Sequence, residues 1–224
     1  MRTALLLGAS GLIGGHCLEL LLRDEAYDQI IALVRKALPK NHPKLIQHEV
    51  NFDRLSEHAN LLKADDVFCC LGTTIKKAGS QEAFRKVDFT YAHEAAKIAA
   101  ANGTKQFLLV SSLGADAKSS VFYSRVKGEI EAVISALNFM SVSIFRPSLL
   151  LGERTEFRLA ERLAEPFAKA LSFFLIGSLR KYRAIEARTV AAAMIAVAKA
   201  KTQGVSFYES DRIQVIKEQG FKRV

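Results

Sequence analysis

The chain has 224 residues, 50% of them hydrophobic, which favours one folded domain that buries roughly 70% of the surface of its unfolded chain. Its 32 Lys and Arg residues outnumber 23 Asp and Glu residues, giving a net charge of +9, but the two signs are interspersed, which disfavours nucleic acid as a partner. Three cysteines and five scattered histidines form neither a disulfide framework nor a metal-binding spacing, and this cysteine usage is typical of a reduced, cytoplasmic protein.

The N-terminal residues predict a strand, a tight turn and a helix in succession. An apolar run over Ala4–Leu7 stops at Gly8, and the glycines follow the spacing G-x-x-G-x-x-G. Gly8 lets the chain reverse, Gly11 lets backbone N–H groups approach a pyrophosphate, and Gly14 lets the helix pack closely on the strand. Because helix N-termini favour anions, the turn predicts a dinucleotide site, with a plain strand-to-helix connection as the alternative. The expected cofactor contacts in this turn are Gly8, Ser10, Gly11, Leu12, Ile13 and Gly14.

The same N-terminal stretch is not typical of a targeting segment. It is rich in glycine, and the strand–turn–helix pattern accounts for its residues. Elsewhere no uncharged apolar run approaches the ~18 residues that span a bilayer. We therefore expect a cytoplasmic protein without an integral membrane segment.

The second predicted strand indicates which dinucleotide is bound. Ile30–Val34 is a buried apolar run that ends in Arg35 and Lys36. Folds selective for NAD carry an acid here for the ribose 2′-hydroxyl, whereas an arginine accommodates a 2′-phosphate through paired charge-assisted bonds. The pattern therefore predicts that NADP(H) is preferred over NAD(H), with a solvent-facing pair of cations as the alternative.

Two further predicted strands end at the same crevice, because the carboxyl ends of parallel strands share one edge of a sheet. Leu45–Val50 leads to residues beside the adenine, although Phe52 fits the hydrophobic core equally well. The strand that begins at Val67 ends in a second glycine turn, where Gly72 either admits a phosphate or ribose of the cofactor or simply ends the strand. The expected contacts here are Asn51, Phe52, Leu71, Gly72 and Thr73.

The next elements predict catalytic groups. A long helix from Ser80 to Asn102 precedes the strand Gln106–Val110, which delivers Ser112 to the crevice. The pattern then predicts a helix over Asp116–Leu137.

On this helix Tyr123 and Lys127 are four residues apart, so they share one face. Because an ammonium near a phenol favours the phenolate, Tyr123 is a candidate proton donor to a substrate carbonyl oxygen, which Ser112 would also bond. A solvent-facing pair on a surface helix is the alternative.

These motifs resemble a known superfamily. The glycine turn over Gly8–Gly14, the Tyr123-x-x-x-Lys127 pair and Phe145–Pro147, in this order, resemble the atypical branch of the short-chain dehydrogenase/reductases. Residues 68–74, 111–116 and 126–129 resemble more closely the Tat-interactive-protein-like oxidoreductases. The similarity covers about residues 3–165.

The resemblance implies a Rossmann fold that binds NADPH, with Tyr123 as the proton donor or acceptor and Lys127 on the nicotinamide ribose. It also places Pro147 under the nicotinamide, and Leu150 and Arg158 near the cofactor. Members of this family are also described as binding partners and regulators.

The C-terminal part predicts less. The apolar run Ala168–Leu179 fits a lid over the substrate, a dimer face or a membrane-surface helix. An amphipathic helix over Arg188–Lys199 follows, and Phe207–Ile216 closes the domain.

We therefore predict an α/β protein with a doubly wound parallel sheet of the Rossmann type, in which residues 153–224 contribute a small helical substrate cap. The leading hypothesis is an NADPH-dependent oxidoreductase that reduces a small carbonyl compound, with Tyr123 as proton donor and Lys127 and Ser112 in support. The alternatives are a non-catalytic NADPH-binding regulator or scaffold, and a nucleotide-sugar epimerase or dehydratase. We expect a monomer or a homodimer.

Overall fold

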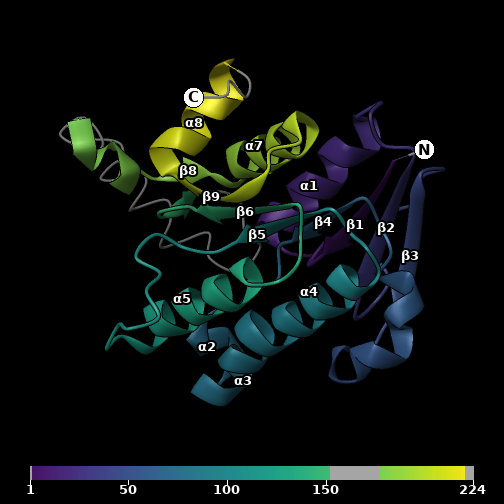
Figure 1. The fold of residues 1–224 in the computed structure, drawn as a ribbon, viewed down its shortest axis with the longest axis horizontal. Coiled ribbons are helices and arrows are strands. Elements are labelled where there is room, and N and C mark those ends of the chain that lie inside the picture. The colour runs from purple at the N-terminus through teal and green to yellow at the C-terminus, as the bar shows by residue number, and fades with distance from the viewer. Residues whose placement is uncertain (1, 152–176, 220–224) are drawn as a thin grey trace.

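The computed structural model describes residues 2–151 and 177–219. Seven parallel strands form one sheet in the order β3-β2-β1-β4-β5-β6-β9 (Figure 1). The strands of this sheet are β1 (Thr3–Leu7), β2 (Gln29–Val34), β3 (Leu45–Glu49), β4 (Asp66–Cys69), β5 (Gln106–Val110), β6 (Ser141–Arg146) and β9 (Gly204–Glu209). The predicted doubly wound fold is therefore confirmed.

Helices cover both faces of the sheet, as Figure 1 shows. One face carries α1 (Leu12–Arg23), α7 (Ala187–Ala200) and α8 (Ser210–Gln219). The other carries α2 (Ile75–Ala78), α3 (Gln81–Arg85), the π-helical segment η2 (Lys86–Tyr91), α4 (Ala92–Ala101) and α5 (Phe122–Ser135). Two buried clusters lie on opposite faces of the sheet because successive strand residues alternate sides: Leu6 belongs to one cluster, and Leu5 and Leu7 belong to the other.

Shorter elements complete the described chain. The 3-10 segment η1 (Phe52–Leu61) follows β3, and η3 (Gly177–Tyr182) precedes the C-terminal helices. A two-stranded parallel sheet pairs β7 (Leu150–Leu151) with β8 (Ile185–Glu186). Within residues 2–151 and 177–219, every helix is too short or too polar to span a bilayer.

The strand order reverses between β1 and β4, which are neighbours although β2 and β3 separate them in the sequence. The N–H of Cys70 donates to the carbonyl of Leu7 at 2.9 Å, so the two strands end side by side. Such a switch point opens a crevice at the carboxyl ends of the strands, where open α/β sheets bind ligands. The two glycine turns predicted from the sequence follow these two strands.

The long helix predicted from Ser80 to Asn102 is present, but its middle is a π-helical turn, η2. The prediction that a helix begins at Asp116 is wrong, because α5 begins at Phe122. Asp116 Oδ1 accepts the N–H of Lys118 at 2.9 Å, and such local bonds compete with helix formation. The preceding loop also lies against Gly128, where a Cβ would come within 2.1 Å of the backbone nitrogen of Ala117.

Two predictions cannot be placed. Arg158 and residues 168–176 of the predicted apolar run lie outside the described residues.

Candidate cofactor and catalytic site

The first glycine turn connects β1 to α1 through close backbone contacts. Gly8 has φ +82°, and its carbonyl accepts the N–H of Gly11 at 2.9 Å. A Cβ on Gly8 would lie 2.5 Å from the carbonyl oxygen of Cys70, and one on Gly14 would lie 2.0 Å from that of Gly8. Both positions therefore require glycine for packing, and Gly8 also requires it for its left-handed backbone.

The N-terminus of α1 is suited to an anion. Gly11 is its N-cap and has no side-chain oxygen, and the first turn of the helix contains no acidic residue. Its N–H groups and the positive end of the helix dipole therefore face the crevice uncompensated, which suits a pyrophosphate. Ser10 and Gly11 are exposed, whereas the side chain of Ile13 is buried in the core, so Ile13 can meet a cofactor only through its backbone.

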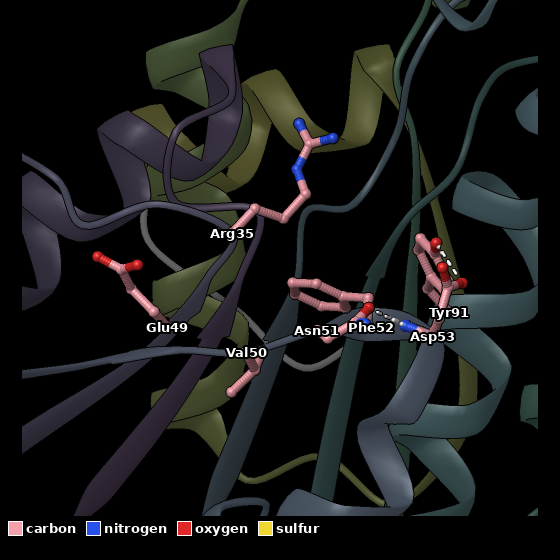
Figure 2. Close-up of a pocket in the computed structure, with 7 residues that line it drawn as sticks. All are labelled: Arg35, Glu49, Val50, Asn51, Phe52, Asp53 and Tyr91. Atoms are coloured by element: carbon pink, nitrogen blue, oxygen red, sulfur yellow. Dashed lines mark hydrogen bonds between the residues drawn. The ribbon is translucent and has the colours of Figure 1, made fainter.

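A cavity of about 480 Å³ lies at the ends of β2 and β3 (Figure 2). In the view of Figure 2, Arg35 lies above the ring of Phe52, Glu49 lies to the left of it, and Asp53 and Tyr91 lie to the right. Glu49 Oε1 accepts the N–H of Ala37 at 2.9 Å. The lining residues are Arg35, Glu49, Val50, Asn51, Phe52, Asp53 and Tyr91.

Three of the predicted residues, Arg35, Asn51 and Phe52, thus meet in one cavity, whereas Lys36 is exposed and does not line it. The sequence interpretation missed Tyr91, which comes from η2.

The ring of Tyr91 lies 5.5 Å from that of Phe52, and its hydroxyl donates to Asp53 Oδ1 at 2.7 Å. Lys86 pairs with the same oxygen at 2.7 Å. Lys86 and Tyr91 together hold the pKa of Asp53 below its ordinary value.

A second cavity, of about 590 Å³, contains the predicted catalytic side chains of Ser112 and Tyr123. Ser112 Oγ is buried and has no hydrogen-bond partner among the described residues. The ring of Tyr123 packs on that of Phe84, with centroids 5.4 Å apart. The lining residues are Ser112, Leu113, Gly114, Tyr123, Arg146, Pro147, Ser148, Leu149, Lys181, Tyr182 and Glu209.

The cations that line this second cavity have acidic partners. Arg146 Nε lies 3.0 and 3.2 Å from the two carboxylate oxygens of Glu131, and Lys181 Nζ lies 3.3 Å from Glu209 Oε2. Predicted Leu150 lies apart from both cavities: it pairs with β8 and packs against the core of the α1 face.

Lys127 is buried next to an acid that the sequence interpretation missed. Its Nζ lies 2.7 Å from Asp88 Oδ1, and the two side chains are 6% and 0% exposed. Asp88 Oδ2 accepts the N–H of Thr73 at 2.8 Å, in the loop that follows β4. Burial acts to lower the pKa of Lys127, but the attraction of Asp88 and Tyr123 outweighs it, and the pKa is raised above its ordinary value.

Gly72 lies over this ion pair. A Cβ on Gly72 would lie 3.5 Å from Asp88 Oδ1 and 3.9 Å from Lys127 Nζ. Because Gly72 is exposed, the absence of a side chain leaves the ammonium close to the crevice. The spacing of the predicted helix could have indicated that Asp88 is buried. It comes four residues after Phe84 and four before Ala92, and residues four apart lie on the same face of a helix.

This combination of features defines a class. The sheet is doubly wound and parallel, a glycine turn lies at its switch point, and the tyrosine–lysine helix comes after β5 and the serines that follow that strand. These features are those of the NAD(P)-binding Rossmann proteins of the short-chain dehydrogenase/reductase type.

Comparison with known proteins gives the family. A family profile described as NAD(P)H-binding matches residues 8–172. The chain is 40% identical over 174 residues to Protein HTATIP2 of Rattus norvegicus, covering 76% of this chain and 72% of the relative. It is 38% identical over 178 residues to the mitochondrial protein fmp52 of Emericella nidulans, covering 76% of each. The chain belongs to this NAD(P)H-binding family and, within it, to the atypical short-chain dehydrogenase/reductases that include HTATIP2 and FMP52.

Solved structures share the fold at low sequence identity. The enzyme WbmH of Bordetella bronchiseptica, in complex with NAD+, has a TM-score of 0.69 and 16% identity over 97% of this chain and 79% of WbmH. MoeE5 in complex with UDP-glucose and NAD has a TM-score of 0.66 and 14% identity over 98% of this chain and 81% of MoeE5.

Proposed function

We propose that this protein is an NADPH-dependent reductase that acts on the carbonyl group of a small molecule. The observation that carries the proposal is the common cavity of Ser112 and Tyr123, at the edge of the sheet where the dinucleotide turn also lies. The residues fit the cofactor, because the first turn presents bare N–H groups at a helix N-terminus and its glycines permit close approach of a pyrophosphate. When bound, NADPH supplies the hydride that reduces a carbonyl carbon.

Residues of the chain donate the proton, orient the carbonyl group and bind the cofactor. Tyr123 donates the proton to the carbonyl oxygen, and the unpartnered hydroxyl of Ser112 bonds the same oxygen and orients it. Lys127, close beneath Gly72, would bind the ribose of the cofactor, and Pro147, which lines the cavity, would contact the nicotinamide. The described part of the C-terminal cap also lines the cavity, through Lys181, Tyr182 and Glu209.

The test of this mechanism is the substitution Tyr123→Phe, which removes the hydroxyl and keeps the ring that packs on Phe84. The variant is expected to bind NADPH as the wild type does and to lose turnover by about 100-fold or more. NADPH oxidation with a panel of aldehydes and ketones gives the rate, and titration of NADPH fluorescence gives the affinity. Unchanged turnover would remove Tyr123 from the mechanism, and a wild type that binds NADPH without oxidising it would favour the regulator.

The preference for NADPH is proposed from Arg35, which lines the cavity of Asn51 and Phe52. A guanidinium forms paired bonds with a 2′-phosphate, and Glu49 is engaged by the N–H of Ala37. Arg35→Ser is expected to reduce the ratio of NADPH to NADH affinity by about 10-fold or more, a loss of one charge-assisted pair. Lys40→Ser removes an exposed cation outside the cavity and serves as the control.

The location of the protein stays a prediction. The sequence favours the cytoplasm, whereas the fungal relatives are named as mitochondrial proteins.

A further inference from the structure

The buried ion pair between Asp88 and Lys127 needs an explanation. Taking two charges out of water costs several kcal/mol per ion, and a buried pair often stabilises a fold no better than apolar residues of the same volume. Asp88 lies on the buried stripe between Phe84 and Ala92, where an apolar side chain would satisfy the packing. Stability alone therefore does not account for an acid at this position.

The backbone around Asp88 is also unusual. Asp88 lies within η2, a π-helical segment in the middle of an otherwise α-helical stretch, and it is the buried residue of that segment. Such segments are rare and occur frequently at functional sites, because they change the direction of a side chain without ending the helix. Here the segment places a carboxylate between two groups from other elements, Lys127 of α5 and the N–H of Thr73.

We propose that Asp88 is a positioning residue of the reductase site, which holds Lys127 as an ammonium beneath Gly72 and ties it to the loop after β4. The inference rests on the proposed function, because the ammonium matters only if a cofactor is bound above it. Both carboxylate oxygens are used: Oδ1 fixes the ammonium at 2.7 Å, and Oδ2 fixes Thr73 at 2.8 Å. A movement of the loop and a movement of the ammonium are therefore coupled through one side chain.

The charge of Lys127 depends on this partner. The titratable groups that act on it are Asp88 from η2, Tyr123 from its own helix and Cys69 from β4. Of these, Asp88 forms the direct ion pair and acts most strongly against the effect of burial. An amide in place of the carboxylate keeps the size of the side chain but removes its charge, so burial then favours the neutral amine and the ammonium is lost at a lower pH.

The experiment compares NADPH affinity with pH in the full chain. Wild type, Asp88→Asn and Lys127→Met are titrated with NADPH by fluorescence from roughly pH 6 to pH 10. Asp88→Asn is expected to bind about 10-fold more weakly at neutral pH and to weaken further as the pH rises, whereas the wild type stays level over that range. Adding Lys127→Met to Asp88→Asn is expected to weaken binding little more, because both changes remove the same interaction.

A matched control separates this role from a general effect of losing an acid. Glu94→Gln removes an exposed carboxylate from α4, next along the same helical stretch, where it pairs with Lys97 at 3.2 Å. It is expected to bind NADPH as the wild type does at every pH. Equal loss in Glu94→Gln and Asp88→Asn would overturn the proposal.

The outcomes distinguish this inference from the proposed function. A wild type that fails to bind NADPH overturns the proposed function whatever Asp88 does, whereas a wild type that binds while Asp88→Asn matches it across the pH range overturns the role of Asp88 alone. If Asp88→Asn does not fold, NMR of the wild type tests whether Lys127 is held as an ammonium. The measurement follows the ¹⁵N signal of the Lys127 side chain, which is assigned by its loss in Lys127→Arg. An ammonium that persists above the ordinary pKa of lysine supports the proposal, and a neutral amine at neutral pH contradicts it.

Discussion

The two glycine turns at the switch point of the sheet are built in different ways. The turn from Gly8 to Gly14 is made by neighbouring residues, through the bond from Gly11 N–H to Gly8 and the contact of Gly14 with the same carbonyl. The turn at Gly72 is made by residues far apart in the sequence, since Asp88 and Lys127 meet beneath it. The hydrogen bond within the first turn is therefore local, although Gly8 also lies against the backbone of Cys70 at the end of β4. The second turn depends on contacts between segments that are far apart in the sequence.

The two turns also differ in the room they leave. A Cβ would clash with backbone at Gly8 and Gly14, but it would make ordinary contacts at Gly72. We therefore expect a substitution of Gly14 in the first turn to lower the free energy of unfolding, and a substitution of Gly72 to lower the affinity for the cofactor. Three measurements test this distinction.

The largest effect is expected from Gly14→Ala. Its Cβ would lie 2.0 Å from the carbonyl oxygen of Gly8, so the turn must shift to accept it. Overpacking of this kind costs about 3 kcal/mol, to be measured as the free energy of unfolding in urea, and NADPH binding is expected to fall with it.

Gly15→Ala is the matched control for this prediction. Its Cβ would lie 3.7 Å from the carbonyl oxygen of Ala9, an ordinary contact, and alanine is favoured over glycine in a helix by up to ~1 kcal/mol. Gly15→Ala is therefore expected to be as stable as the wild type or more so. Similar destabilisation by both substitutions would contradict the local character of the first turn.

The next largest effect is expected at alkaline pH. It comes in part from Cys69, at the end of β4 and three residues before Gly72. Burial raises the pKa of Cys69, at the end of β4, from 9.0 to about 12. Its unfolded form loses the proton first, so the stabilisation present below pH 9.0 is lost as the pH rises toward about 12. One proton of this kind gives a slope of ~1.4 kcal/mol per pH unit.

The measurement is the free energy of unfolding against pH for wild type and Cys69→Ala. The variant is expected to be less stable at neutral pH but to decline less steeply under alkaline conditions. Tyr27, whose burial raises its pKa as well, contributes the same slope to both proteins. Parallel curves would show that Cys69 does not contribute.

The smallest effect is expected from Gly72→Ala. Its methyl group fits, so the free energy of unfolding is expected to change by less than about 1 kcal/mol. The same methyl group covers the ammonium of Lys127, and NADPH is expected to bind about 10-fold more weakly. Affinity loss without destabilisation would separate the second turn from the first, whereas unchanged affinity would place the cofactor away from Gly72.

The sequence alone determined the elements that depend on residues close together in the chain. The apolar runs predict the buried strands, the glycine spacing predicts the first turn, and the four-residue spacing of Tyr123 and Lys127 places them on one helix face. The local pattern predicted a helix from Asp116, but α5 begins only at Phe122. The side chain of Asp116 accepts the N–H of Lys118, and the loop at Asp116 and Ala117 lies against Gly128, so this segment is not helical.

The tertiary structure decided what the site contains. It brought Asp88 to Lys127, Tyr91 to Phe52, and Glu209 to the cavity of Tyr123, although these partners come from different elements. No spacing in the sequence specifies such pairs, because they form only where parallel strands end together and helices from separate segments pack on one face of the sheet. The strands form where apolar residues are buried, and a run of apolar residues is visible in the sequence. The partner of a buried charge is decided by which side chains lie close together in three dimensions, and this depends on the fold.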